Sequence, residues 1–348
     1  MLDVQGFGLT LPSLLAEAVT NYPDEPVLYQ WQKKDWRSRR DPRSGGLTAR
    51  KLQQSVTELA LGLSDLGLQR GDRIGFLLHS NLDFCLADLG SLLAGLVNVP
   101  IDLTQTLENI IYVLNHSGAK ALIVADLSLL DQVLPYLGSV TDLRWLIVAQ
   151  GSNNWLDARL KRLTATESIK RTIPPVCLRI SVFLPENATP TKPVKVPQCL
   201  ELLSLEEIQQ RGAQIADWSS FQKLEVKINP KDLATLIYIA GDSRQPQGVM
   251  LSHENIVTNV LTAFSNHSEI GKGSKEVALS FLPLTHIFAR SFFYGHLWSG
   301  HRLYFSTPNR VVRHFQEVQP TIVITVPRLL EKVYQKIMQR GARLKGWR

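Results

Sequence analysis

The sequence predicts an α/β fold built in layers around a largely parallel sheet. Helical patterns alternate with short apolar stretches along most of the chain, the connections between them are short, and no internal repeat is visible. The 348 residues are 44% hydrophobic and 20% charged, which is typical of a globular protein with a substantial core and argues against disorder.

The alternation of helices and strands is clearest before residue 150. Residues 11–21 have the spacing of a short amphipathic helix, and residues 26–31 alternate like a strand. A longer helix that ends at Gly67 leads through a tight turn to a buried strand at 73–78. We therefore predict a first α/β subdomain over residues 1–150. Its further elements are a helix at about 82–95, a strand at 95–102, and a helix and a strand over 106–126, separated by Gly118.

The pattern weakens in the middle of the chain and returns near residue 230. Residues 171–200 contain six prolines, so we predict an irregular Pro-rich connection over 151–229, with one strand at 176–184. A second α/β subdomain is predicted over 230–348. Its expected strands are 232–241, 276–286, 301–305 and 320–327, and its expected helices are 252–264, capped by Ser252 or His253, 290–300, 310–319 and a basic helix at 327–348.

Charge and cysteine content exclude little. The formal charge of +7 suits anionic partners but is common in proteins without them. The three cysteines, Cys85, Cys177 and Cys199, have neither metal-ligand nor redox spacing, so no metal site is predicted. The longest apolar run, 89–101, is too short to span a membrane, and the N-terminus does not resemble a signal peptide. We expect a soluble cytoplasmic protein that touches membranes at most peripherally, with no nucleic-acid partner.

A basic segment at residues 32–51 leaves two interpretations open. It is either a solvated loop or hairpin, or a site for an acidic lipid or a nucleotide.

The stretch at residues 236–255 predicts a buried strand, a polar turn and a capped helix. In such a turn, backbone N–H groups point at one spot, and a bound anion gains hydrogen bonds and a favourable helix dipole. The turn alone is weak evidence for phosphate binding, because many turns share this outline.

This stretch resembles the signature loop of the AMP-forming adenylate ligases, the acyl-CoA synthetase family. Residues 66–81, 99–124, 282–290 and 319–337 resemble further family segments, in family order, and the last two fit the long-chain fatty-acyl branch. The loop positions that fit the family pattern are Tyr238, Gly241, Ser243, Pro246, Gly248, Val249, Met250, Leu251, Ser252, His253 and Asn255.

The resemblance implies the fold of the layered, parallel-sheet N-terminal domain of an adenylate-forming ligase, incomplete at the C-terminus. It implies activation of a long-chain fatty acid with Mg and ATP, followed by transfer of the acyl group to coenzyme A or an acyl carrier protein. His286 would be the catalytic histidine, near the acyl and phosphate groups. The alternative for His286 is a satisfied core histidine at a strand end. The implied cofactor-binding residues are Tyr238, Gly241, Asp242, Ser243, Arg244, Gln247 and Gly248.

Several residues depart from the family pattern. Asp242 places a carboxylate where polyphosphate should lie, and two like charges about 4 Å apart repel by roughly 1 kcal/mol in water and about 4 at an effective dielectric of 20. Gln247 replaces a lysine whose charge-assisted hydrogen bond contributes about 1.5–3 kcal/mol. Arg244 takes a glycine position and either pairs with Asp242 or replaces the missing lysine. The remaining departures are Ile239, Ala240 and Ala289, which replace a threonine, a serine and a glutamate.

Family members continue beyond the segment that 319–337 resembles, into the adenine-stacking element, the magnesium-binding pair and the small C-terminal domain. We find no counterpart of these and expect a partner to cover the open sheet edge. Three hypotheses follow: a degenerate ligase without activity of its own, a non-catalytic acyl- or partner-binding module, and half of a split ligase.

Overall fold

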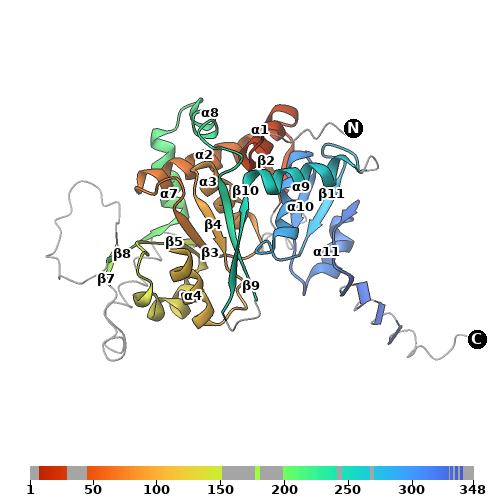
Figure 1. Ribbon diagram of the computed structural model, residues 1–348. Helices are drawn as coiled ribbons and strands as arrows, with labels where there is room; N and C mark the ends of the chain where they lie inside the picture. Colours follow the sequence, from red (N-terminus) through yellow and green to blue (C-terminus); the bar gives the residue numbers. More distant parts are fainter. Residues whose placement is uncertain are drawn as a thin grey trace, which may run out of the picture.

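The strands form two sheets in the computed structural model (Figure 1). The structure describes residues 8–29, 45–150, 177–180, 199–240, 245–266 and 270–328, together with residues 330, 331, 334, 335, 338 and 339.

The larger sheet has eight strands, and every neighbouring pair is parallel except β10 and β9. Its strands, in spatial order, are β10 (Gln247–Ser252), β9 (Leu233–Ile239), β4 (Val97–Pro100), β3 (Arg73–Leu77), β5 (Ala119–Asp126), β6 (Trp145–Gln150), β8 (Cys199–Ser204) and β7 (Cys177–Ile180).

The smaller sheet has five strands, and only β1 and β2 pair antiparallel. Its spatial order is β13 (Ile322–Val323), β11 (Val277–Ser280), β12 (Arg302–Phe305), β1 (Pro26–Tyr29) and β2 (Leu47–Thr48).

Helices pack on both faces of the larger sheet. Alternate residues of its strands point to opposite faces, so apolar strand residues contribute to two separate cores. In β5, Ala121 and Ile123 belong to one core, and Leu122 and Val124 belong to another. The first core also contains residues of the smaller sheet, so it joins the two sheets. Its helices are α1 (Leu11–Asn21), α2 (Ala49–Asp65), α3 (Leu82–Leu93), α7 (Leu205–Ile215), α8 (Ser220–Glu225), α9 (His253–Ser265) and α10 (Ile287–Trp298).

The other faces have their own helices. The second core packs α4 (Leu107–Ser117), α5 (Leu127–Val133) and the short 3-10 helix η1 (Leu134–Ser139) against the larger sheet. The outer face of the smaller sheet packs against α11 (Val311–Val318).

Local sequence signals explain where several helices begin. The side chains of Thr48, Asn81 and Thr106 each accept a hydrogen bond from a backbone N–H in the first turn of α2, α3 and α4. Ser252 caps α9 in the same way, and Asn255 completes a capping box. The predicted stop of the helix before β5 is confirmed, because Gly118 adopts the left-handed conformation, with φ of 62°.

The predicted layered α/β fold with largely parallel sheets is confirmed. The two sheets, however, do not divide the chain at residues 150 and 230, where the subdomain boundaries were predicted. β1 and β2 join the smaller sheet through β12, and β9 and β10 join the larger sheet through β4. Strand pairing across more than 130 residues leaves no trace in a local pattern, so the sequence could not reveal it.

The predicted irregular connection at 151–229 also differs from the structure where it is described. Residues 199–229 contain β8, α7 and α8, and residues 177–180 form the one strand that was predicted there. The rest of 151–198, and most of the basic segment at 32–51, lie outside the described residues.

Candidate functional site

The predicted phosphate loop joins the two strands of a hairpin rather than a strand and a helix. β10 pairs antiparallel with β9, from Gln247 opposite Ile239 to Ser252 opposite Leu233. Helix α9 starts directly after Ser252, at the far end of a six-residue strand that is about 20 Å long. The sequence-based expectation that the α9 dipole acts on the loop is therefore wrong.

Only part of the predicted loop site can be placed. Gly241, Asp242, Ser243 and Arg244 lie outside the described residues. Gln247 and Gly248 open β10 and are exposed. A Cβ at Gly248 would lie 3.2 Å from Cζ of Tyr238, so this glycine also leaves room for the tyrosine ring on the facing strand.

Tyr238 is held by helix α4. Its hydroxyl lies 2.8 Å from Nδ1 of His116, whose ring stacks on Tyr112 with centroids 5.3 Å apart. Burial, and then the neighbouring Tyr112, raise the pKa of Tyr238, so the hydroxyl is neutral at physiological pH. This tyrosine supports the base of the loop from the side of α4.

His253, which fits the family pattern just after the hairpin, has a structural contact. Its Nδ1 accepts a hydrogen bond of 3.2 Å from the backbone N–H of Leu11, which ties α9 to the start of α1. Burial lowers the pKa of His253 to about 4, so the ring is neutral.

A cavity of ≈ 310 Å³ opens where the carboxyl ends of β4 and β9 meet the start of α10. We call it the loop cavity. Ligands commonly bind at the carboxyl ends of parallel strands. Its polar lining comprises Asp102, Thr104, Gln105, Asn109, Tyr238, Gln245, Thr285 and His286.

Asp102 and His286 face each other across the loop cavity, with Oδ2 and Nε2 4.0 Å apart. Burial alone would raise the pKa of Asp102. Hydrogen bonds from the hydroxyl and backbone N–H of Thr104, together with His286 and Thr285, lower it overall. Asp102 is therefore a carboxylate at neutral pH.

His286 is not a buried core histidine, because its side chain is 66% exposed. It occupies the N-cap position of α10 without a side-chain capping hydrogen bond. Its predicted catalytic role stays a prediction. Sequence reasoning missed Asp102, although it is the charged residue that ends the predicted strand at 95–102, and such a position can carry a functional side chain.

A fully buried polar network holds α10 against the larger sheet. The Arg290 guanidinium contacts Oδ1 of Asp88 at 3.1 Å and Oγ1 of Thr235 at 2.8 Å. Tyr294 donates to the other oxygen of Asp88, and the side-chain amide of Asn98 donates to Oδ1 at 2.8 Å. The network joins α3, β4, β9 and α10, which are the elements that carry or support the cavity residues.

An apolar groove runs between α9 and α10, with a volume of ≈ 490 Å³. We call it the α9–α10 groove. It begins at Ile287 and Phe288, directly after His286. The other residues that line it are Leu251, Asn255, Ile256, Asn259, Val260, Ala263, Phe264, Ser291 and Phe292.

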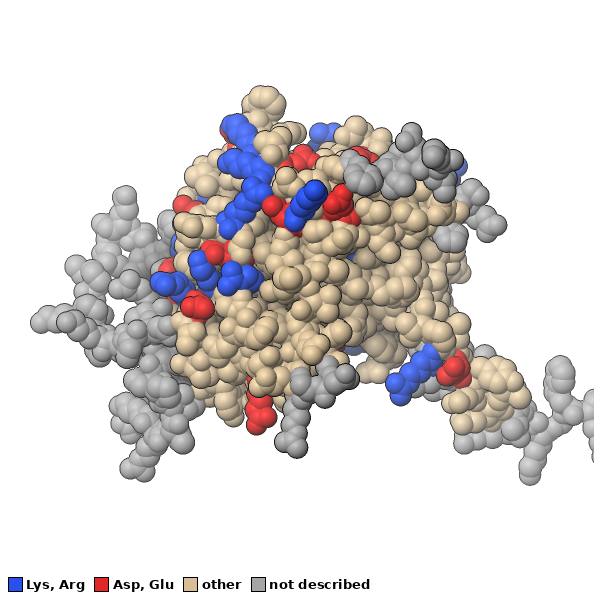
Figure 2. Space-filling view, in the orientation of Figure 1, with Lys and Arg blue, Asp and Glu red and all other residues tan. Residues whose placement is uncertain are grey.

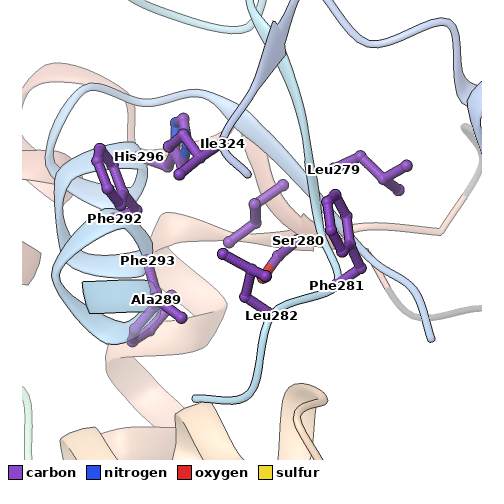
Figure 3. A pocket seen from close by; sticks show the side chains of 10 residues that line it. Leu279, Ser280, Phe281, Leu282, Ala289, Phe292, Phe293, His296 and Ile324 are labelled. Carbon is purple, nitrogen blue, oxygen red and sulfur yellow. The ribbon is translucent and has the colours of Figure 1, made fainter. Parts of the chain in front are cut away.

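The space on the other side of α10 is much smaller. Residues 279–282 line a cavity of ≈ 20 Å³ together with Phe292 and Phe293, which is room for about one water molecule, and Figure 3 shows the Leu279 side chain turned away from α10. Of the aromatic residues around His286, Phe293 and Tyr294 are therefore core residues, whereas Phe288 and Phe292 line the groove.

The described residues offer neither a membrane span nor a metal cluster. No helix there is long and apolar enough to cross a membrane. No group of three or more His, Cys, Asp or Glu side chains there could hold a metal ion.

Comparison with known proteins identifies the class. The family model for AMP-binding enzymes matches residues 15–347. The chain therefore belongs to the AMP-binding enzyme family, as the resemblance of the loop and the four further segments predicted.

The relatives include long-chain acyl ligases. The chain is 25% identical to the long-chain-fatty-acid–CoA ligase ACSBG2 of Xenopus laevis, over 96% of this chain and 39% of that protein. It is 26% identical to the long-chain-fatty-acid–CoA ligase FadD15 of Mycobacterium bovis, over 85% of this chain and 41% of that protein. The chain thus spans less than half the length of these relatives.

Solved structures show the same fold. The adenylation domain of a carboxylate reductase from Mycobacterium chelonae aligns with a TM-score of 0.71 and 20% identity, over 99% of this chain and 50% of that one. A long-chain-fatty-acid–CoA ligase from Archaeoglobus fulgidus aligns with a TM-score of 0.63 and 17% identity, over 90% of this chain and 50% of that one.

Proposed function

We propose that the chain binds a long-chain carboxylic acid in the α9–α10 groove, with the carboxylate toward His286. The observation that carries the proposal is the groove itself, because its apolar lining starts at the residue that follows His286. Its volume of ≈ 490 Å³ lies within the range of small-molecule sites. The long-chain acyl substrates of the relatives support the same ligand class.

We also propose that these residues alone do not adenylate the bound acid. Mg-ATP would supply the adenylyl group, and a site for it must neutralise the charge of a triphosphate. The described lining of the loop cavity contains no Lys or Arg and carries the Asp102 carboxylate. Gln247 replaces the family lysine, and Ile239 and Ala240 remove two hydroxyl donors. The described residues therefore fit Mg-ATP poorly, and coenzyme A would lack an adenylate to attack.

Calorimetric titration of the chain with palmitate tests the first half of the proposal. Ala263→Trp places a large side chain in the groove from a partly exposed position and should weaken palmitate binding by about tenfold or more, a loss of about 1.4 kcal/mol or more. Ala213→Trp, on the exposed side of α7, is the matched control and should leave the affinity unchanged. Equal affinities of the two variants, or no saturable binding by the unmodified chain, would contradict acid binding in the groove.

Thermal unfolding with Mg-ATP tests the second half. A ligand that binds only the folded state raises its stability by about 2.7 kcal/mol at a hundredfold excess over Kd. We expect no shift of Tm with Mg-ATP, and a clear shift with palmitate. A shift with Mg-ATP would show that the loop still holds polyphosphate, and would leave the proposal for the groove standing.

A further inference from the structure

β10 is an edge strand of the larger sheet, and it pairs with β9 on one side only. In an antiparallel pair, every second residue directs its N–H and C=O away from the partner strand. Outside β9, no described residue forms a hydrogen bond with the backbone of residues 247–251. The strand therefore presents open donors and acceptors on which a further strand can pair.

The side chains along this edge are exposed and largely apolar. Met250 is 70% exposed, and Val249 and Ile239, which lies opposite Gln247 on β9, are exposed as well. Val249 and Met250 are neighbours in one strand and therefore point to opposite faces of the sheet. Apolar side chains thus flank the open edge on both faces.

β10 lacks the features that usually protect an edge strand. Edges are commonly guarded by charged side chains, prolines, bulges or short length. Residues 247–251 contain neither a charged residue nor a proline, and the register of the hairpin shifts only beyond Leu251. The other edge strands of the two described sheets are shorter, with two residues in β13 and β2 and four in β7, against six in β10.

The surroundings of the edge are uncharged as well. β9 contains no charged residue. Figure 2 shows a broad area without Lys, Arg, Asp or Glu in the middle of the visible face, where Figure 1 places the β9–β10 hairpin. Two copies of the chain, each with a formal charge of +7, repel at long range, but no like charges would meet along this strand.

The strand is also complementary to itself. Two copies of one strand can pair antiparallel about a two-fold axis, so that both copies make the same contacts. With the axis at Val249, this residue faces Val249 of the copy, and Gly248 faces Met250 of the copy. Met250 would then cover the space beside Gly248, where β10 has no side chain of its own. The pairing buries the most exposed apolar side chain of the strand.

We propose that the β10 edge, residues 247–251, pairs with the β10 edge of a second copy of this chain and joins the two larger sheets. A partner for this edge has to be an uncharged, extended segment with a small residue opposite Met250, and the strand itself meets each requirement. The pairing does not depend on what the groove or the loop cavity binds.

The interface would be small. The strand is about 20 Å long, and one strand on each side buries less than the about 800 Å² per partner of a standard protein complex. We therefore expect a reversible dimer with a dissociation constant in the micromolar range. High salt should favour the dimer, because it screens the repulsion between two chains of like net charge.

Sedimentation velocity over a concentration series tests the proposal. The unmodified chain should convert from monomer to dimer as its concentration rises to about 100 μM. Met250→Lys brings a positive charge from each copy to the paired strands and should raise the dissociation constant by about tenfold or more. Ile215→Lys, at a 56% exposed residue of α7, adds the same charge elsewhere and is the matched control, which should dimerise like the unmodified chain.

Amide hydrogen exchange locates the contact. The amides of residues 247–251 that point away from β9 should exchange quickly in the monomer and become protected in the dimer. Met250→Lys should lose this protection. Its melting temperature in dilute solution should match that of the unmodified chain, because the side chain is largely exposed.

Four results would overturn the proposal. The first is a chain that stays monomeric at about 100 μM in both low and high salt. The second is a dimer that forms equally well in the two lysine variants, and the third is a dimer without added protection of residues 247–251. The fourth is slow exchange of these amides in the monomer, which would mean that another part of the chain already covers the edge.

Discussion

The loop cavity and the α9–α10 groove adjoin at the start of α10, and they differ in what they can bind. The loop cavity is lined by polar groups, carries the Asp102 carboxylate and has no Lys or Arg in its described lining. The groove is lined mainly by aliphatic and aromatic side chains. Under the proposed function, the groove keeps the apolar lining that an acyl chain needs, whereas the described lining of the loop cavity lacks the cations that a polyphosphate needs.

This contrast has a physical basis in what each ligand requires. An apolar chain needs only an apolar surface of adequate size, which tolerates many substitutions. A polyphosphate needs several donors and cations placed together, and each lost charge-assisted hydrogen bond costs about 1.5–3 kcal/mol. The same number of substitutions therefore removes phosphate binding sooner than acyl binding.

The strongest test of this contrast is to remove the support that both regions share. Arg290→Met leaves the Asp88 carboxylate buried without its cation, and we expect a loss of about 3–5 kcal/mol of unfolding free energy. Adding Asp88→Leu should recover only part of this loss, because it removes the unpaired carboxylate but leaves the buried Tyr294 hydroxyl and Asn98 amide without that acceptor. Urea denaturation measures both variants.

A matched control for Arg290 is available on the surface. Arg313 pairs with Glu317 at 2.7 Å in an exposed position, and Arg313→Met should cost less than about 1 kcal/mol. If Arg290→Met costs no more than this control, the network does not hold the two regions together.

Acid should lower the stability of the folded chain through His253, whose ring ties α9 to the start of α1. Its pKa is lowered to about 4 in the folded chain, from about 6.5 in the unfolded chain, so the unfolded state binds the proton first as the pH falls. The stability contributed by the neutral ring is complete above pH 6.5 and is lost progressively toward pH 4. The loss reaches about 3 kcal/mol, at about 1.36 kcal/mol per unit of pKa.

His253→Asn keeps an acceptor for the Leu11 N–H and removes the titration, so its unfolding free energy should fall less steeply between pH 6.5 and 4. His286→Asn changes an exposed histidine of the loop cavity and is the control. The prediction fails if His253→Asn shows the same slope as the unmodified chain.

The sequence predicted the elements of the two regions better than their arrangement. The capped start of α9, the helix around residues 290–300 and the strand near 233–239 all depend on local spacing and capping, and all three are present. β10 was not predicted, because Gln247 and Gly248 open an exposed edge strand whose partner supplies the pairing.

The candidate site was harder to predict for the same reason. Asp102 and His286 come from loops after strands of different sheets, 184 positions apart, and only tertiary packing brings them together. The family resemblance identified Tyr238, but it did not reveal that His116 of α4 holds its hydroxyl.

Glycine-to-alanine substitutions compare the two regions directly. A Cβ at Gly295 would lie 2.0 Å from the Phe264 ring, inside the packed contact between α9 and α10, so Gly295→Ala should cost about 1–3 kcal/mol. A Cβ at Gly248 would lie 3.2 Å from the Tyr238 ring, which lies beside the loop cavity and needs to move by only a few tenths of an ångström. Gly248→Ala should therefore cost less than about 1 kcal/mol.

Thermal unfolding measures both variants. The affinity for palmitate should fall only in Gly295→Ala, because Phe264 lines the groove. Equal costs for the two variants would mean that the groove is as loosely packed as the base of the loop.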